Sequence, residues 1–321
     1  MKHAYLIIAH NEYPVLKALL KMLDNDRNTI FLHIDYRAQS LYEAMKAFHT
    51  SKADLQILSH RIPVYWGDIS QVKVEYLLLE TAMHYGNYDY YHLLSGVDLP
   101  LKSQQDIHRF FDQYPGKEFV SFWNTPAHQK DLNRKVSYYY YLTQYRRPGE
   151  KWHALATPFF NLLLIIQKAF GIRRKKETDF QKGAQWFSIT QAFAKYLISQ
   201  KDWVLKRFKH TLCPDEIFVQ TVLWNSPFKK NIYSLQDEQK GNMRLIDWQR
   251  GHPYVWQDGD LDELLHSTLL FARKFNSGQR AVIEGLLREH TQREKLLKLK
   301  APGMPFFSIF VCYRNLIKKS I

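Results

Sequence analysis

Cysteine and long hydrophobic runs are both scarce in this sequence. Only two cysteines, Cys213 and Cys312, occur among 321 residues, which excludes a disulfide framework and favours a reducing compartment. No apolar run is long enough to span a bilayer, and the run after His3 stops at His10 without a signal-peptide cleavage pattern. We therefore expect a cytoplasmic protein, either soluble or peripheral on the inner face of the membrane.

The signatures of several common protein classes are also missing. The sequence has no Walker loop, Gly-x-Gly-x-x-Gly fingerprint or Gly-x-Ser-x-Gly elbow, which disfavours an NTPase, a dehydrogenase and an α/β-hydrolase. It has no zinc-ligand spacing, RNA-binding signature or helix-turn-helix pattern, so the net charge of +14 does not indicate nucleic acid. That charge suits an anionic membrane face or a phosphorylated small molecule. A non-catalytic basic protein that binds polyanions or membrane is the alternative to an enzyme.

What the sequence does contain is an alternation of apolar runs and helical patterns. A composition of 45% hydrophobic and 15% aromatic residues permits a sizeable core. Residues 4–9 and 29–34 have the pattern of buried strands on either side of a helix at 15–22, which is a βαβ unit. We expect an α/β fold with a mainly parallel central sheet flanked by helices, and ligands bind beyond the carboxyl ends of such strands.

Charged residues follow the predicted strands directly. Asp35 and Arg37 come after the second strand, and Asp98 comes after a strand at 90–94. Their place at the carboxyl edge of the sheet makes them candidate ligand contacts. The alternatives are a turn or helix-cap aspartate for Asp35 and a loop aspartate bonded to its own backbone for Asp98.

The stretch 213–223 has the pattern of the first turns of a buried helix. Pro214 suits the first helical position, and Asp215 and Glu216 follow where the helix dipole favours carboxylates. The apolar residues of 218–223 would fix this helix against a core. A carboxylate held so rigidly could take a proton from a bound hydroxyl. An ordinary acidic helix start is the alternative, and the stretch on its own favours it.

A cationic pair, Arg273 and Lys274, follows a helical pattern at 262–270. The pair could neutralise a diphosphate, or it could cap the dipole at the end of that helix. The Asp-x-Asp spacings at 24–26 and 258–260 have the composition of turns, so we expect no metal. One anchored carboxylate, acids at strand ends and a late cationic pair fit sugar transfer from a nucleotide donor without a metal.

Two segments combine apolar and basic residues. The apolar stretch 159–170 runs into the cationic cluster 173–176, which suits the surface of an anionic membrane. A core helix followed by a solvated loop is the alternative. Residues 281–300 are amphipathic and basic, and 305–321 mix aromatic residues with lysine. We therefore expect a main domain at 1–276 and a helical C-terminal extension at 277–321.

Six short motifs occur in an order that is informative as a set: 31–35, 65–67, 94–100, 183–187, 212–218 and 271–275. Together they resemble the motifs of the core-2/I-branching β-1,6-N-acetylglucosaminyltransferase and peptide O-xylosyltransferase family. The resemblance implies a GT-A-like fold and an inverting mechanism that needs no metal. It implies that Glu216 is the base, that Arg273 and Lys274 bind the diphosphate, and that Asp98 lies in the donor site. It also suggests Asp35 and Arg37 as nucleoside contacts, and Gln185 and Trp186 as walls of the donor or acceptor site.

The function implied by this resemblance is transfer of a sugar from a UDP-sugar to a hydroxyl of a glycan or lipid-linked glycan. N-acetylglucosamine is the favoured sugar, with xylose or another hexose as alternatives, and no cofactor is expected. The sequence lacks the membrane anchor, the luminal stem and the many cysteines of the animal members. We therefore expect a bacterial-type cytoplasmic enzyme of capsule, exopolysaccharide or lipid-linked glycan synthesis, with an anionic membrane surface as a further candidate partner and no nucleic acid.

Overall fold

The computed structural model describes residues 1–147, 149–150 and 152–299. Its strands are β1 (His3–Ala9), β2 (Asn28–Ile34), β3 (Asp54–Ile57), β4 (Tyr90–Ser95), β5 (Asp98–Pro100), β6 (Phe119–Val120), β7 (Phe187–Thr190), β8 (Arg244–Ile246) and β9 (Phe271–Arg273). Its α-helices are α1 (Tyr13–Met22), α2 (Gln39–Lys46), α3 (Ser70–Tyr85), α4 (Gln104–Gln113), α5 (Pro126–Ser137), α6 (His153–Ala169), α7 (Gln191–Ser199), α8 (Lys201–Phe208), α9 (Phe218–Trp224), α10 (Glu238–Asn242), α11 (Leu261–His266) and α12 (Arg280–Leu299). Short 3₁₀ turns are η1 (Thr143–Tyr145), η2 (Pro214–Glu216), η3 (Pro227–Asn231) and η4 (Asp258–Asp260).

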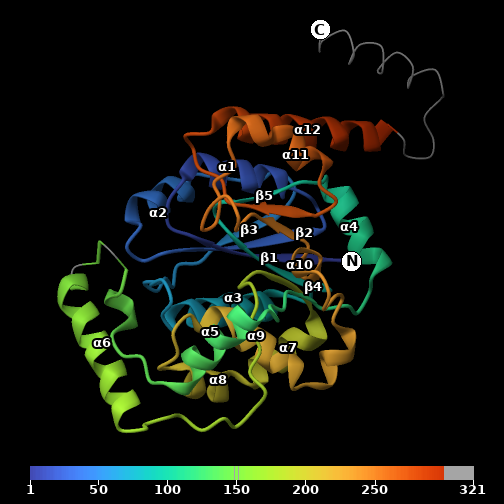
Figure 1. Cartoon of the computed structure of the whole chain (residues 1–321). Coiled ribbons are helices and arrows are strands. Elements are labelled where there is room, and N and C mark those ends of the chain that lie inside the picture. The colour runs from blue at the N-terminus through green and yellow to red at the C-terminus, as the bar shows by residue number, and fades with distance from the viewer. Residues whose placement is uncertain (148, 151, 300–321) are drawn as a thin grey trace.

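Six strands form a central sheet in the order β3-β2-β1-β4-β7-β6 (Figure 1). Strands β3, β2, β1 and β4 are parallel, whereas β7 runs antiparallel to both β4 and β6. The strand order reverses between β1 and β4, and ligands bind at the carboxyl ends of strands where such a reversal occurs. The predicted α/β fold with a mainly parallel sheet and flanking helices is confirmed, as expected for a GT-A-like fold.

Alternate side chains of β1 enter two separate cores, one on each face of the sheet. Ala4 and Leu6 pack on the face that α3, α7 and α9 cover. Tyr5 and Ile7 pack on the opposite face, where α1, α4, α11 and α12 lie (Figure 1). Because a strand points successive side chains to opposite faces, burial on both sides requires the continuous apolar run seen in the sequence.

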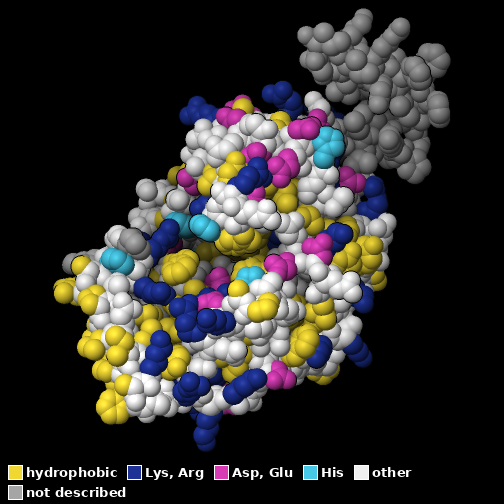
Figure 2. Space-filling model, viewed as in Figure 1, with side chains coloured by type: hydrophobic (Ala, Val, Ile, Leu, Met, Phe, Trp, Pro, Cys, Tyr) yellow, Lys and Arg dark blue, Asp and Glu magenta, His cyan; other side chains and the backbone are white. Residues whose placement is uncertain are grey.

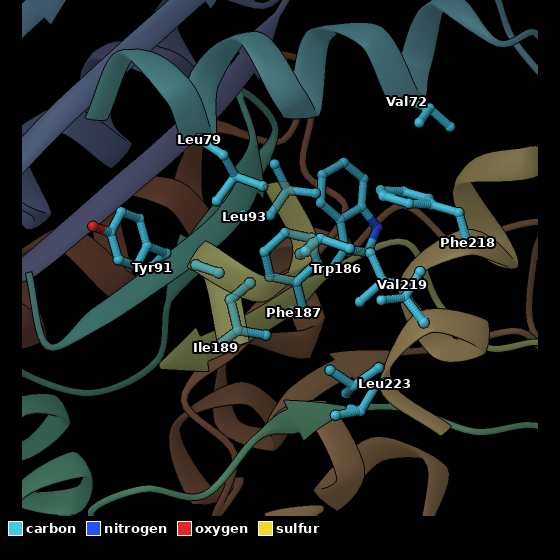
Figure 3. Close-up of a cluster of buried hydrophobic side chains, with 14 of the residues drawn as sticks. Val72, Leu79, Tyr91, Leu93, Trp186, Phe187, Ile189, Phe218, Val219 and Leu223 are labelled. Atoms are coloured by element: carbon cyan, nitrogen blue, oxygen red, sulfur yellow. The ribbon is translucent and has the colours of Figure 1, made fainter. Parts of the chain in front are cut away.

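The core beneath α3 fixes the segment that leads into the candidate site. Figure 3 shows Trp186 between Leu93 of β4 and Phe218 of α9. All three side chains belong to one buried cluster. Full burial of a large apolar side chain contributes about 2–3 kcal/mol, so the cluster holds both α9 and the approach to β7 in place.

A second, three-stranded sheet in the order β5-β9-β8 joins the end of β4. Its β8 is tied to the central sheet by the buried guanidinium of Arg244, which donates to the carbonyl of Phe187 at 2.7 Å and to Ser188 Oγ at 3.0 Å. In the β5–β9 pair, Asp98 lies opposite Arg273. The second sheet therefore brings a late part of the chain to the carboxyl edge of the first.

The predicted helical extension begins with α12, whose first turns are packed against the main body. Val282, Ile283 and Leu286 are buried in the core that also contains residues of α1. The predicted boundary at 276 stays a prediction, and the tail at 305–321 lies outside the described residues. Within the described part of the chain, no helix combines the length and the apolar character needed to cross a membrane.

Three buried histidines stack beside β1 and β4. His3 Nδ1 lies 2.9 Å from His92 Nε2, and the rings of His3 and His108 stack with their centroids 4.5 Å apart. Burial is the main cause that lowers the pKa of all three imidazoles, to about 3 for His108, and nearby positive charges lower it further. The folded state therefore holds these side chains neutral.

We predict that this stack makes the protein acid-sensitive. The folded-state pKa lies below the unfolded value near 6.5, so stability should fall as the pH drops from about 6.5 towards 4. Between pH 7 and pH 5 the urea-derived free energy of unfolding should fall by roughly 2 kcal/mol for each imidazole that stays neutral. His108→Gln should flatten this dependence, whereas the exposed His266→Gln should not. An unchanged slope in His108→Gln would contradict the assignment.

Candidate active site

The carboxyl edge of the sheet gathers several of the predicted residues around His10, which directly follows β1. Burial is the main cause that lowers the pKa of His10; the nearby charge of Asp35 opposes this shift, and those of Arg147, Arg273 and Arg37 add to it. All of these groups therefore share one electrostatic neighbourhood. The set joins residues that follow β1 and β2 to residues much later in the chain.

A glycine allows β1 and β4 to approach closely at this edge. The backbone N–H of Gly96 donates to the carbonyl of Ile8 at 2.9 Å. A Cβ added at Gly96 would lie 2.8 Å from the Cβ of Ala9, closer than van der Waals contact permits. Residue 96 must therefore lack a side chain for the loop after β4 to reach the site.

Asp35 and Arg37 form a rigid pair at the end of β2. The buried carboxylate of Asp35 accepts hydrogen bonds from Arg37 Nη2 at 3.0 Å and from the backbone N–H of Val64 at 2.9 Å. Burial alone would raise the pKa of Asp35, but these hydrogen bonds hold it below its ordinary value. The guanidinium of Arg37 also lies 4.3 Å from the ring centre of Tyr65. The turn geometry expected as an alternative is present, and the contact with a nucleoside stays a prediction.

Asp98 and Arg273 form the central ion pair of the site. Asp98 Oδ1 accepts from Arg273 Nη1 at 2.7 Å, and Asp98 Oδ2 accepts from the backbone N–H of Ser95 at 2.8 Å. The guanidinium carbon of Arg273 also lies 4.2 Å from the ring centre of Trp186. Arg273 is thus held between a carboxylate and an indole, with 19% of its side chain still exposed.

The expectation that Arg273 and Lys274 lie near a helix C-terminus is wrong. Helix α11 ends at His266, and Arg273 is the last residue of β9. A three-residue strand has too little sequence pattern to be distinguished from a helix end, and its pairing with β5 and β8 decides the outcome. Capping of a helix dipole therefore does not explain these cations.

Lys274 adds a second cation in surroundings that are already positive. Burial lowers the pKa of Lys274, and the positive charges of Arg273 and Arg147 lower it further. Like charges held together in a partly dry site repel one another. A bound anion would relieve this repulsion, which makes the Arg147–Arg273–Lys274 group a fitting site for a phosphorylated ligand.

Glu216 lies on a short 3₁₀ turn rather than on the single helix that the sequence predicted. Turn η2 and helix α9 are separated at Ile217, whose φ is −130° and ψ −39°. The left-handed conformation of Cys213, at φ 49°, brings the chain into the turn. Because η2 spans only Pro214–Glu216, a helix dipole contributes little to holding Glu216.

Two buried lysines hold the Glu216 carboxylate instead. Glu216 Oε2 lies 3.1 Å from Lys135 Nζ and 3.3 Å from Lys182 Nζ, and both lysines also pair with Asp131. Burial alone would raise the pKa of Asp131, but these lysines hold it well below its usual range. About a quarter of the Glu216 side chain stays exposed, at 25%. The lysines therefore orient and neutralise the carboxylate while leaving it accessible to a ligand.

Sequence reasoning missed Asp131, Lys135 and Lys182. The first two are four residues apart on α5, the spacing at which a carboxylate and an amine meet on one helical face. That signal was present in a part of the chain whose overall pattern is weak. Nothing in the sequence near Lys182 indicates its partners, because both come from distant segments.

A short segment, 183–186, links the Glu216 group to the Arg273 group. The backbone N–H of Gly183 donates to the carbonyl of Glu216 at 2.9 Å, and Trp186 contacts Arg273. The Cα atoms of Gly183 and Trp186 can lie at most about 11 Å apart, since three peptide units separate them. A Cβ at Gly183 would come within 1.8 Å of the carbonyl oxygen of Ser121, so this close approach requires glycine.

The predicted wall residues Gln185 and Trp186 differ in where they point. Gln185 Nε2 donates to the buried Glu75 Oε1 at 2.9 Å, so its amide faces α3. Trp186 packs in the core and touches Arg273 from there. Two further tryptophans lie beside Lys182. Its Nζ is 5.2 Å from the ring centre of Trp123, and Trp123 packs edge-on against the exposed Trp248.

The two Asp-x-Asp spacings serve structural turns. Asp24 precedes β2, at the opposite end of that strand from Asp35, and accepts from the backbone N–H groups of Lys52 and Ala53. Asp260 pairs with Arg250 at 3.2 Å. Within the described ranges, no group of three or more His, Cys, Asp or Glu residues is arranged to hold a metal ion.

A mainly parallel sheet with charged residues gathered at its switch point is the α/β architecture in which ligands generally bind at that edge. The family model described as "Branch: Core-2/I-Branching enzyme" matches residues 3–258. The chain belongs to this family of glycosyltransferases. Arg273 and Lys274 lie beyond the matched residues, and diphosphate binding by these two residues stays a prediction.

Xylosyltransferases are among the relatives that the chain resembles. It is 24% identical over 260 residues to Xylosyltransferase 2 of Rattus norvegicus, with 77% of this chain and 26% of that protein covered. It is 22% identical over 298 residues to Xylosyltransferase sqv-6 of Caenorhabditis briggsae, covering 83% of this chain and 34% of that protein. The chain thus spans about a quarter to a third of the length of these relatives. A crystal structure of mouse xyloside xylosyltransferase 1 in its apo form aligns with 86% of this chain over 99% of its own chain, at 10% sequence identity. Its TM-score of 0.39 is too low to bear on the fold.

The carboxyl group of Asp215, next to Glu216, is buried, and its ionised form is unfavourable in the folded protein. Burial is the main cause that raises the pKa of Asp215 to about 7, and the negative charge of Glu216 adds to it. Among the described residues, Asp215 Oδ1 has no hydrogen-bond partner. Folding therefore favours the protonated acid at this position.

We predict that Asp215→Asn stabilises the protein increasingly as the pH rises from about 4 to 7. A raised folded-state pKa contributes stability at low pH that is lost as the pH passes through 7, at roughly 1.4 kcal/mol per pH unit, and asparagine avoids that loss. Urea unfolding at pH 5 and pH 8 measures the difference. Asp262→Asn, at an exposed carboxylate, is the matched control and should show no such trend. A stability difference between Asp215→Asn and wild type that does not change with pH would refute the raised pKa.

Proposed function

We propose that the chain is an inverting glycosyltransferase that moves a sugar from a UDP-sugar to a hydroxyl of a glycan acceptor. The observation that carries this proposal is the link between two charged groups at the carboxyl edge of the sheet. Arg273, which Asp98 and Trp186 hold in place, and the adjacent Lys274 suit the diphosphate of the donor, with Arg147 near enough to lower the pKa of Lys274 further. The half-buried carboxylate of Glu216 lies one short segment away.

The cations would bind the donor and stabilise the leaving group. As the bond between the sugar and UDP breaks, negative charge grows on the diphosphate, and fixed positive charges favour that state over the starting one. Arg273 suits this role because Asp98 and Trp186 already hold its guanidinium. Its orientation therefore costs little entropy when the donor binds.

Glu216 would act on the acceptor. Its carboxylate takes the proton of the acceptor hydroxyl while that oxygen attacks the anomeric carbon, and UDP departs from the opposite face with the bonding electrons. A new glycosidic bond forms, the bond to UDP breaks, and the proton passes from Glu216 to solvent. One attack from the opposite face inverts the anomeric configuration.

The donor and acceptor are proposed more specifically as follows. N-acetylglucosamine is the sugar that the family resemblance favours, and the xylosyltransferase relatives make xylose the first alternative. We propose that no metal is required, because the cation cluster supplies the positive charge that a metal supplies elsewhere. The acceptor would be a glycan or lipid-linked glycan of capsule or exopolysaccharide synthesis in the cytoplasm, which the low cysteine content suits.

Glu216→Gln should abolish most turnover and leave UDP binding nearly intact. Glutamine keeps the shape of the side chain but cannot accept the proton, and loss of a general base costs about 10²–10⁴-fold in rate. Turnover of a panel of UDP-sugars and calorimetric binding of UDP measure the two effects. Glu43→Gln, at an exposed carboxylate, should behave as wild type. Full turnover in Glu216→Gln would remove this residue from the mechanism.

The double change Arg273→Ala with Lys274→Ala should weaken UDP binding by at least about tenfold, because each charge-assisted contact to phosphate contributes roughly 1.5–3 kcal/mol. Calorimetric titration of UDP measures this loss.

Wild-type turnover should survive excess chelator, since the same two cations would supply the required positive charge.

The exposed pair Lys229 and Lys230 on η3 offers a matched control. Their replacement by alanine should leave UDP affinity unchanged. Equal UDP affinity in wild type and the Arg273–Lys274 variant would refute the assignment. Salt-sensitive binding of nucleic acid without any UDP binding would instead favour a non-catalytic polyanion-binding protein.

A further inference from the structure

Helix α6 turns a broad apolar surface away from the rest of the protein. The exposed side chains include Leu155 at 66%, Ile165 at 62% and, just after the helix, Phe170 at 78%. Leu155, Phe159, Leu162 and Ile166 follow one another at helical spacing, so they form a continuous stripe. The expected alternative of a core helix is therefore wrong, because most of its large apolar residues lie outside the core.

The opposite side of α6 is firmly attached. Phe160 packs against Tyr140, and the buried amide of Gln167 exchanges hydrogen bonds with the backbone of Tyr139 at 2.7 and 2.9 Å. These contacts use the inner face of the helix, and among the described residues the side chains of the outer stripe stay exposed. Figure 1 shows α6 at one flank of the molecule, away from the central sheet.

Positive charge continues directly from the C-terminal end of this stripe. Lys168, Arg173, Lys175 and Lys176 are all exposed. Figure 2 shows hydrophobic side chains gathered at the flank where α6 lies, with Lys and Arg side chains beside them. An apolar helix face bordered by cations matches the boundary between the acyl chains and the headgroups of an anionic bilayer.

An apolar groove opens on the same surface. Its volume is about 520 Å³, and it lies between α6 and η1, lined by Leu142, Tyr145, Trp152, Leu155, Ala156 and Phe159. Tryptophan and tyrosine are enriched where a protein meets the headgroup region, since their rings are apolar with one polar atom. A groove of this kind can accept part of an acyl chain once the helix lies on a membrane.

We propose that α6 docks the protein on an anionic membrane surface, with its apolar stripe in the outer acyl layer and the exposed side chains of Arg173, Lys175 and Lys176 among the headgroups. The occupant is a lipid bilayer rather than a protein because exposed cations, in the last turn of α6 and in the loop directly after it, border the exposed apolar face of the helix. The inference does not depend on sugar transfer, and its test reads membrane binding alone.

Docking at α6 would bring the candidate active site close to the membrane. Phe160 and Leu164 pack in one cluster with Leu212 and Cys213, which immediately precede the turn that carries Glu216. This places the membrane on the Glu216 side of the site.

The experiment is flotation of the full chain with vesicles of phosphatidylcholine, with and without phosphatidylglycerol. Wild type should float with the anionic vesicles at low salt. Leu162→Glu with Ile165→Glu should reduce this binding by at least about tenfold, because two carboxylates would enter the apolar layer. Leu235→Glu, at a leucine that is 44% exposed on a loop elsewhere, is the matched control and should bind as wild type.

A second variant tests the electrostatic contribution to membrane binding without altering the apolar stripe. Arg173→Ala with Lys175→Ala and Lys176→Ala should weaken binding to anionic vesicles by about tenfold or more and flatten its salt dependence. Thermal unfolding should match wild type for both variants, since all the changed side chains are exposed.

Three results would overturn the proposal. One is that wild type does not bind anionic vesicles. Another is that the Leu162–Ile165 variant binds as well as wild type, which would assign the membrane contact to another segment. The third is a dimer of wild type that the same variant converts to monomer without any vesicle binding, which would make a second copy of the chain the occupant of the stripe.

Discussion

The candidate site depends on the ion pair between Asp98 of β5 and Arg273 of β9, which connects two segments that are far apart in the sequence. It closes the pairing of β5 with β9 and fixes a guanidinium at the carboxyl end of β4. Breaking a buried pair leaves an uncompensated charge, so neither residue can be replaced without disturbing the other. The pair therefore serves both the fold, as a cross-strand contact between β5 and β9 of the second sheet, and the site, as the anchor of its cationic side.

The Glu216 side of the site is held in a different way. Its turn is too short for a helix dipole to matter, and two lysines from separate segments orient the carboxylate. Segment 183–186 connects this side to Arg273, with a glycine at one end and a core tryptophan at the other. Because Trp186 belongs to the core beneath α3, the spacing between Glu216 and Arg273 is set by core packing rather than by a mobile loop.

Much of the fold could be predicted because β1, β2 and β4 are continuous apolar runs, and their carboxyl ends locate Asp35 and Asp98. The division of the predicted helix into turn η2 and helix α9 could not be predicted. The backbone leaves the helical conformation at Ile217, but the apolar periodicity of the sequence continues across that residue. Strand β9 escaped detection since three residues carry no period, and only its pairing with distant strands defines it. Lys182 was also missed, because its partners Asp131 and Glu216 come from distant segments that only tertiary packing brings together.

The order in which the chain is made has a consequence for Asp98. Its partner Arg273 is 175 residues later, so at 5–20 residues per second a ribosome needs about 9–35 s to supply it. During that interval the nascent protein can form the β3-β2-β1-β4 sheet while β5 lacks its neighbour β9. A chain interrupted before residue 271 would retain the first strands of the central sheet yet present an unpaired acid and a bare strand edge, which is a form suited to recognition by chaperones or proteases.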